Sequence, residues 1–484
     1  MQQGFRFRAY PNAQQAETLL RWIGCQRFIY NAKVEEDRYY RACQRRLVNV
    51  GIQRPIDQQY ARFITDETPW LREVPSVVLR NGAVRWKNAY SRHFSGLGGR
   101  PKIRKRHGRQ SVWLTCELFK FERRDEQSWR LIIGTPKHAL GELRLDAHVP
   151  LEQAPASIRV SVEAGRWYLS FSLDDEQPEY TEAEIGAWLR AMSDEEILAR
   201  TIGCDRGVAN PLMTDKGLTC DFTSQEKRRF KRRSTRCKKL QRQAARQLAA
   251  SKRSGVRSRC YAKTKLAIAR SKAKDARVRN DFAHRTSYRL AELEGVALYG
   301  LEDLKIANMT RSASGSIEQP GRNVAQKKGL NRSILGSAWG AIRIYLTYKA
   351  RRRHKLVVAV LSAFTSQDCS QCGHRHKDNR RSQAVFVCQA CGFEAHADVN
   401  AAGNIRMRAV EQLTSEAWTP KKSKRTMRMR RKGDTQKDRQ DLSDRLPSGK
   451  PLLVEEVLDC AGQRPAQQSL TKRERTLTPA LVAE

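Results

Sequence analysis

The stretch CQACGFEAHADVN, residues 388–400, sets a pair of cysteines only six residues ahead of an aspartate. A second pair, CSQC at residues 369–372, precedes it, with 15 residues between the pairs. The spacing C-x2-C-x15-C-x2-C is typical of a tetrahedral zinc site, and Gly373 and Gly392 permit a tight turn after each pair. A closed four-sulfur site has no open position for water. We therefore expect a structural Zn²⁺ held by Cys369, Cys372, Cys388 and Cys391.

Three acids lie where strands or helices are predicted to begin or end. Asp205 ends the strand pattern IGCD, and Glu302 ends the strand pattern LYGLE. Asp398 stands at the start of the predicted helix VNAAGNIRMRAVEQL. Each acid alone also fits a structural role, as a turn residue, a helix-start acid or an N-cap. Together, in a strongly basic chain, they indicate hard oxygen ligands for two Mg²⁺ ions that act on a phosphodiester.

The charge of the chain points to nucleic acid. Lys and Arg number 92 against 51 Asp and Glu among 484 residues, which gives a net charge of +41. The basic residues are spread along the chain, which favours a polyanion over an anionic membrane surface or mere solubility. No run of about 18 apolar residues occurs and the start MQQGFRFRAYPN lacks an apolar signal core, so we expect a cytoplasmic, nucleoid-associated protein without membrane contact. The eight remaining cysteines are widely spaced, as expected of reduced thiols.

Residues 1–175 combine strand patterns with a helical interruption. FRFRAYPN alternates as a half-buried strand, Asn12 is a plausible N-cap, and a helical insertion is predicted over about residues 12–95. Strands return from residue 111 to 173, with a hairpin around EAGR. The simplest architecture is a β-barrel-like domain with a helical insertion. The basic loop SGLGGRPKIRKRHGR, residues 95–109, suits contact with phosphates, and a solvated linker is its alternative.

The remaining chain divides into a linker, a second domain and a tail. Residues 176–198 reverse the charge sign and are predicted to be a linker with a short helix. Residues 199–414 carry short strands, two long helices with cationic faces between 224 and 290, and the zinc ribbon at 365–395. Residues 415–484 have little periodic apolar content and are predicted to be a disordered basic tail.

These motifs resemble a known family. CDRGVANPLMTDKG, LEDLKIANMT and the ribbon followed by HADVNAAGNI are similar to the three RuvC-like motifs and zinc ribbon of the transposon-encoded TnpB proteins. FRAYPNAQQAETLLRWIGCQRFIYN and SGLGGRPKIRKR are similar to the family's N-terminal segment and its basic Gly-Pro loop. The resemblance covers about residues 5–410, except for 175–198.

The resemblance implies an RNA-guided DNA endonuclease of insertion sequences, with guide RNA and target DNA as partners. The implied fold is multidomain α+β: a wedge domain with a helical recognition insertion, then an RNase H-like (RuvC) α/β nuclease domain with the inserted zinc ribbon. Asp205, Glu302 and Asp398 match the family's catalytic acids, and Arg380 or Arg381 matches an arginine near the scissile phosphate, with Arg381 our first choice. Arg206, directly after the first acid, departs from the small or apolar residues common there.

Three other functions stay open at this point: a type V CRISPR effector nuclease, a nuclease-inactive RNA-guided DNA-binding repressor, and a DNA transposase. Retention of all three acids argues against the repressor, and the ribbon between the second and third acids favours the RuvC arrangement over a transposase. The sequence does not indicate the guide RNA, the flanking DNA motif, the cut pattern or the oligomeric state.

Overall fold

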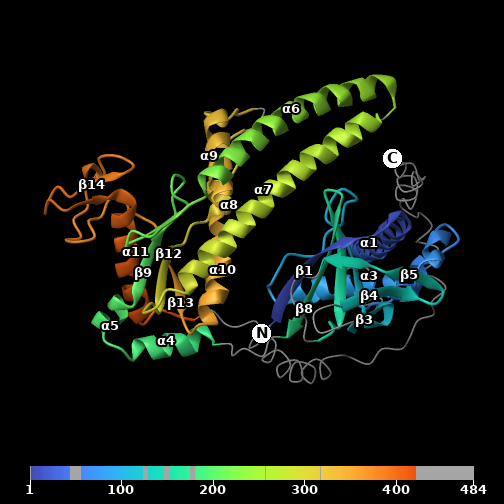
Figure 1. The fold of residues 1–484 in the computed structure, drawn as a ribbon, viewed down its shortest axis with the longest axis horizontal. Coiled ribbons are helices and arrows are strands. Elements are labelled where there is room, and N and C mark those ends of the chain that lie inside the picture. The colour runs from blue at the N-terminus through green and yellow to red at the C-terminus, as the bar shows by residue number, and fades with distance from the viewer. Residues whose placement is uncertain are drawn as a thin grey trace. The chain divides into compact units, whose positions relative to one another are not determined.

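The computed structural model describes residues 2–43, 56–123, 129–146, 153–174, 180–256, 258–316 and 318–420. The chain separates into two compact units, Gln2–Asp175 and Glu176–Ser423, which we describe one at a time (Figure 1). Both contain helices packed on sheets, so the prediction of a multidomain α+β protein is confirmed. Among the described residues, none of the helices combines the length and apolar character needed to cross a bilayer.

The N-terminal unit contains two antiparallel sheets. The five-stranded sheet has the order β2-β7-β8-β1-β6, and its strands are β1 (Gln2–Tyr10), β2 (Gln110–Thr115), β6 (Arg144–Asp146), β7 (Ser157–Glu163) and β8 (Arg166–Asp174). The three-stranded sheet consists of β3 (Phe119–Arg123), β4 (Trp129–Thr135) and β5 (His138–Glu142), preceded by the short helix η3 (Cys116–Leu118). The predicted hairpin is β7–β8, and it turns at Ala164 and Gly165, which both have positive φ.

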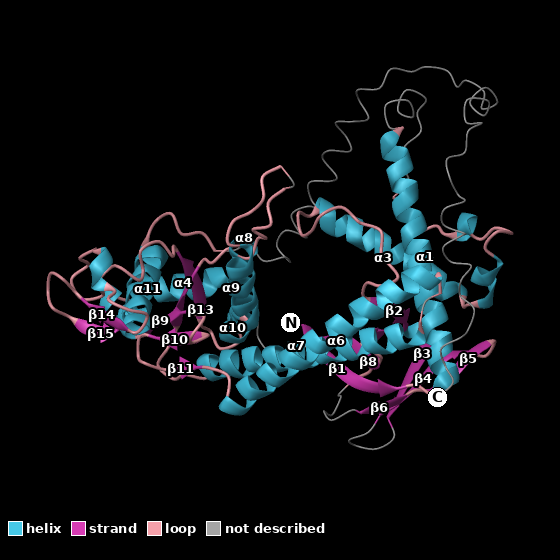
Figure 2. Cartoon of the chain, turned by 90° about the horizontal axis from the view of Figure 1, so that it is seen from above, coloured by secondary structure: helices cyan, strands magenta, loops and turns pink. Residues whose placement is uncertain are grey.

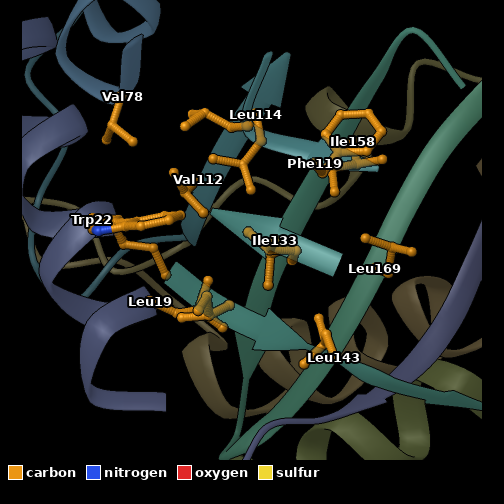
Figure 3. Close-up of a cluster of buried hydrophobic side chains, with 14 of the residues drawn as sticks. Leu19, Trp22, Val78, Val112, Leu114, Phe119, Ile133, Leu143, Ile158 and Leu169 are labelled. Carbon is orange, nitrogen blue, oxygen red and sulfur yellow. The ribbon is translucent and has the colours of Figure 1, made fainter. Parts of the chain in front are cut away.

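Helices α1 (Ala13–Ala42) and α3 (Ser76–Phe94), with the short helices η1 (Ala61–Phe63) and η2 (Pro69–Glu73), occupy the predicted helical insertion. Asn12 caps α1 as predicted, because its side chain accepts a hydrogen bond from the Gln15 backbone N–H at 2.8 Å. Figure 3 shows Leu19 and Trp22 of α1 beside sheet residues such as Val112 and Ile133 in one apolar cluster. This shared core joins the helices to the sheets.

The C-terminal unit is built on a mixed sheet of order β11-β10-β9-β12-β13. Its strands are β9 (Thr201–Asp205), β10 (Leu212–Thr214), β11 (Thr219–Cys220), β12 (Leu298–Glu302) and β13 (Leu356–Val360). Strand β12 is parallel to both β9 and β13, whereas β10 is antiparallel to β9. The carboxyl ends of β9 and β12 therefore lie at the same edge of the sheet.

Helices cover both faces of this sheet. They are α4 (Glu182–Arg190), α5 (Asp194–Ala199), α6 (Ser224–Ser254), α7 (Arg259–Ala291), α8 (Ile306–Met309), α9 (Val324–Gly336), α10 (Trp339–Arg351) and α11 (Ala397–Thr414). The two predicted cationic helices are α6 and α7, which run side by side as a long hairpin (Figures 1 and 2). Ahead of β13 the chain forms two helices, α9 and α10, which end and begin on either side of Ala338, where the backbone is left-handed with φ 59°.

Alternation along the buried strands assigns the two faces. Ile202 and Cys204 of β9 and Tyr299 and Leu301 of β12 belong to the cluster with α7 and α10. On the opposite face, Leu298 of β12 clusters with α4, α5 and α11. Three alternate side chains of β13 belong to the same cluster: Leu356, Val358 and Val360. The described part of the predicted linker, residues 180–198, therefore packs on the sheet, because Ile185, Leu189 and Ile197 are fully buried in this second core.

The first residues after α11 are also anchored. Arg190 of α4 donates hydrogen bonds to the main-chain oxygens of Leu413 at 2.7 Å and Ser415 at 2.8 Å, and its guanidinium lies over the Trp418 ring. These contacts fix the first residues of the segment predicted to be a disordered tail, and the rest of that segment, residues 421–484, lies outside the described part of the chain.

Two glycines decide how closely α11 approaches the sheet. Gly203 of β9 and Gly300 of β12 are paired in register. A Cβ atom on Gly203 would lie 1.8 Å from the Ala402 carbonyl oxygen, and one on Gly300 would lie 2.8 Å from that of Ile405. Helix α11 therefore rests directly on the backbone of these two strands, and only glycine fits at Gly203.

We expect Gly203→Ala to lower the free energy of unfolding by about 3 kcal/mol, because the new methyl group forces the α11 backbone away from β9. Urea unfolding measures the effect. Gly329→Ala in α9 is the matched control, because a Cβ there meets nothing within 4 Å and alanine favours a helix by about 0.5–1 kcal/mol. Wild-type stability of Gly203→Ala would show that α11 is not held this tightly.

Candidate active site and zinc ribbon

The three predicted acids converge on one face of the C-terminal sheet. Asp205 and Glu302 are the last residues of the parallel neighbours β9 and β12, one position beyond the pair Cys204 and Leu301. Each stands two positions after a glycine that faces α11, so alternation turns both acids to that face. Asp398 is the second residue of α11. Two strand ends and one helix start thereby present three carboxylates at the same edge.

The acids are close enough to influence one another's ionisation. Burial, followed by the charges of Glu302 and Asp398, raises the pKa of Asp205 to about 7. Burial also raises the pKa of Glu302, against the hydrogen bond from Thr365 and the positive charge of Arg206. Like charges held in a poorly solvated place favour a bound cation or proton. Additional positive charge would therefore stabilise the ionised acids of this site.

Neighbouring polar groups orient each carboxylate. The Arg206 backbone N–H donates to Asp205 Oδ1 at 2.8 Å, and the Thr365 hydroxyl donates to Glu302 Oε1 at 3.0 Å. Asn210 donates through Nδ2 to Asp398 Oδ2 at 3.3 Å. The positions of these carboxylates are therefore fixed by contacts from separate segments of the chain.

Arg206, which departs from the family pattern, is a buried part of this site. Its side chain is 4% exposed and donates to the Glu302 main-chain oxygen, while its Nε has no hydrogen-bond partner. The guanidinium thus supplies one fixed positive charge behind the acids.

The two candidate arginines occupy different places. Arg380 is half-buried, and its Nη2 lies 3.4 Å from Asp398 Oδ1. Arg381 is exposed. The geometry therefore places Arg380 beside the acids, and not Arg381, which was our first choice from the sequence.

The four cysteines form the predicted cluster. The Sγ atoms of Cys369 and Cys391 are 3.7 Å apart, and those of Cys372 and Cys388 are 3.6 Å apart. A tetrahedron with Zn–S bonds of about 2.3 Å has S···S edges of about 3.8 Å, so these thiols fit zinc. Gly373 and Gly392 have φ of 74° and 70°, the left-handed turns predicted after each pair.

Among the described residues, the cysteines are the one set of three or more His, Cys, Asp or Glu side chains whose ligand atoms all lie within 4.8 Å of one another.

The ribbon is continuous with the third acid. Strands β14 (Val385–Val387) and β15 (Glu394–His396) pair antiparallel, and α11 begins at Ala397, directly after β15. His396 caps α11, accepting at Nδ1 from the Asp398 backbone N–H at 3.2 Å. The second cysteine pair is therefore joined to Asp398 by one short strand.

A basic cavity of about 580 Å³ lies in the N-terminal unit, between α1, α3, the 95–109 loop and the five-stranded sheet. Among the residues that the structure describes, no acid lines it, and the seven basic lining residues are Arg27, Arg85, Arg92, Arg104, Lys105, Arg109 and Arg159. Burial, then the charges of Arg104 and Arg159, lower the pKa of Arg85 to about 9. Such concentrated positive charge suits phosphate groups. The predicted phosphate-contacting loop thus forms one wall of this cavity.

Comparison with protein families agrees with these features. The family described as "Cas12f1-like, TNB domain" matches residues 339–405, which include the four cysteines and Asp398. "Helix-turn-helix domain", of the IS605 OrfB type, matches residues 1–45, and "Probable transposase", of the same type, matches residues 190–313.

Two relatives align over most of the chain. One is the "Putative RNA-guided DNA endonuclease InsQ" of Escherichia coli (strain K12), 31% identical, covering 83% of this chain and 91% of the relative. A "Putative RNA-guided DNA endonuclease" of Streptomyces pristinaespiralis is 25% identical and covers 84% and 89%. A solved structure of the mini-RNA-guided endonuclease CRISPR-Cas_phi3 covers 87% of this chain and 94% of its own, with 11% identity and a TM-score of 0.46.

We expect Asp205→Asn to stabilise the protein in magnesium-free buffer at pH 8. Because the folded state raises the pKa of Asp205 to about 7, folding binds a proton there more tightly than the unfolded chain does. Stability is therefore lost as pH rises from about 4 to about 7, at about 1.4 kcal/mol per unit of pKa shift.

The measurement is the midpoint of thermal unfolding of both proteins from pH 5 to pH 8. The gain should be largest at pH 8 and shrink toward pH 5. Asp281→Asn, a mostly exposed acid on α7, is the control and should change little. An equal midpoint for Asp205→Asn and wild type at pH 8 would show that Asp205 is not electrostatically strained.

Proposed function

Because the chain belongs to the TnpB (IS605 OrfB) family of transposon-encoded RNA-guided endonucleases, we propose that it cuts target DNA chosen by base pairing with a guide RNA. The observation that carries this proposal is the convergence of Asp205, Glu302 and Asp398 at one sheet edge. The C-terminal unit would be the RuvC-like nuclease domain with its ribbon. The N-terminal unit would be the wedge domain, with α1 and α3 as the recognition insertion.

The acids would hold two Mg²⁺ ions. Three converging carboxylates, with raised pKa values at Asp205 and Glu302, suit a pair of cations. When bound, such ions activate the attacking water and stabilise the leaving oxygen. The chain's own part includes orienting Asp205 through the Arg206 backbone N–H and Asp398 through Asn210.

Arg380 would contribute charge at the same edge. In the metal-free protein it pairs with Asp398, and its half-buried position leaves the guanidinium able to meet a phosphate beside the acids. We assign the arginine role near the scissile phosphate to Arg380 in preference to Arg381.

Basic surfaces of both units would hold the nucleic acids. The N-terminal cavity offers seven cations, and α6 carries 13 Lys and Arg against one acid, Glu226. Only Ala244 and Ser251 of α6 are buried, so most of that charge faces solvent. Contacts of this kind bind the backbone without reading sequence, as a guide-directed enzyme requires.

The rival functions differ in what they need. A nuclease-inactive repressor has no use for three gathered acids, whereas a CRISPR effector would use the same site and differ in the origin of its guide. RNA that copurifies with the protein, once sequenced, separates these origins: a transposon-end transcript supports the proposal, and a repeat-array transcript supports the effector.

We expect Asp205→Ala, Glu302→Ala and Asp398→Ala each to abolish guided DNA cutting in Mg²⁺ while guide RNA and target DNA remain bound, because each removes one metal ligand. Cutting and DNA binding are measured on the same RNA-protein complex. Asp303→Ala is the matched control, since this acid follows Glu302 but pairs with Arg343.

Any of the three variants cutting at the wild-type rate would remove that residue from the site. In the same assay, Arg380→Ala should slow cutting at least about 10-fold more than Arg381→Ala. The reverse order would return the arginine role to Arg381.

We expect Cys388→Ser and Cys391→Ser to lose zinc and to lose cutting by about 100-fold or more, because β15 joins the second cysteine pair to Asp398. Guide RNA should stay bound at least in part. Zinc content, RNA retention and cutting are measured on one preparation, with the exposed Cys260→Ser as control. A zinc-free variant that cuts normally would show that the ribbon and the acid site are independent.

A further inference from the structure

The turn between β13 and the first cysteine pair, residues 361–368, contacts the second acid. Thr365 is 4% exposed, and its Oγ1 lies 3.0 Å from Glu302 Oε1 and 3.3 Å from the Ser362 main-chain oxygen. A hydroxyl has one hydrogen, and a bond to an ionised carboxylate is shorter and stronger than one to a neutral carbonyl. The Thr365 hydroxyl therefore donates to Glu302 and fixes one of its two oxygens.

The backbone of this turn is held by the helix that carries the third acid. Asn404 of α11 donates through Nδ2 to the main-chain oxygens of Thr365 at 2.9 Å and Asp368 at 2.6 Å. Asn400, one helical turn earlier, donates to the same Asp368 oxygen at 2.8 Å and accepts from the Ser370 N–H at 2.9 Å. Both asparagines are buried, so these bonds form in a place without competing water.

The ribbon holds the same turn from its other end. Asn379, fully buried, donates to the Gln367 main-chain oxygen at 2.9 Å. The Asp368 carboxylate lies between Arg408 of α11, at 2.7 Å, and Arg375 of the ribbon, at 2.5 Å. The turn is thus fixed on the ribbon side and on the helix side, and Thr365 has little freedom to move.

We infer that Thr365 is a positioning residue for Glu302. The hydrogen bond from Asn404 to the Thr365 main-chain oxygen links Glu302 to the helix that carries Asp398, and the turn that contains Thr365 links Glu302 to the zinc ribbon. The inference rests on the proposed function, in which both acids hold catalytic metal ions. Groups that orient a metal ligand commonly change metal affinity or activity by about 10–100-fold when removed. With one oxygen of Glu302 held by Thr365, the other would be available to a metal ion.

The test compares Thr365→Val, which keeps the shape but loses the hydroxyl, with Thr365→Ser, which keeps the hydroxyl but loses the methyl group. Mn²⁺ bound to each RNA-protein complex is titrated by electron paramagnetic resonance. Binding to the Asp398→Ala complex is subtracted as the background from RNA and other surfaces. Zinc content and the Mg²⁺ dependence of cutting are measured on the same samples.

We expect Thr365→Val to weaken the subtracted Mn²⁺ binding about 10-fold and to raise the half-saturating Mg²⁺ of cutting similarly, while Thr365→Ser stays within about threefold of wild type. Zinc content should not change. If Thr365→Val does not accumulate as folded protein, Thr365→Ala is the second hydroxyl-free variant and should show the same weakening.

Wild-type Mn²⁺ binding by the hydroxyl-free variants, or equal weakening by Thr365→Ser, would overturn the inference while leaving the proposed nuclease intact. A wild-type complex that binds no more Mn²⁺ than Asp398→Ala would overturn the proposed metal site itself, and the inference with it.

Discussion

The direct contact between α11 and the backbone of β9 and β12 is the constraint on which the rest of the C-terminal unit depends. Gly203 and Gly300 pair in register and leave a strip of sheet without side chains, onto which the alanine-rich start of α11 fits. The contact brings Asp398 to the strand ends that carry Asp205 and Glu302. A larger residue in either strand would lift the helix and part the acids.

The zinc ribbon extends this constraint to the turn before it. One cysteine pair leads through β15 into α11, and the other follows a turn that Asn400 and Asn404 hold from the helix. By joining the two cysteine pairs, zinc would connect the start of α11 to the turn that Asn400 and Asn404 of the same helix hold. The metal would influence the acid site through the backbone, since the cysteines themselves touch none of the three acids in any described contact.

The sequence predicted what local patterns encode and missed what tertiary packing decides. Cysteine spacing indicated the zinc cluster, and apolar alternation indicated β9, β12 and the acids that end them. A signal for the close contact with α11 is also present in the sequence, because a glycine stands two positions before Asp205 and another two positions before Glu302. The meaning of these glycines depends on a helix that begins much later in the chain, at Ala397. Thr365 and Asn404 carried no signal, because an ordinary polar residue gains its role only from the neighbour it meets. The acidic composition of residues 176–198 favours a linker, and it outweighs the weak signal of the three apolar residues that the structure buries.

The strained carboxylate of Asp205 also has an evolutionary consequence. A group that destabilises the fold for the sake of chemistry is retained only while the chemistry is selected, because natural proteins lie close to their stability threshold. If selection for cutting relaxed, loss of an acid would increase stability and would leave the cationic residues unaltered. The architecture therefore favours descendants that would bind nucleic acid without cutting it.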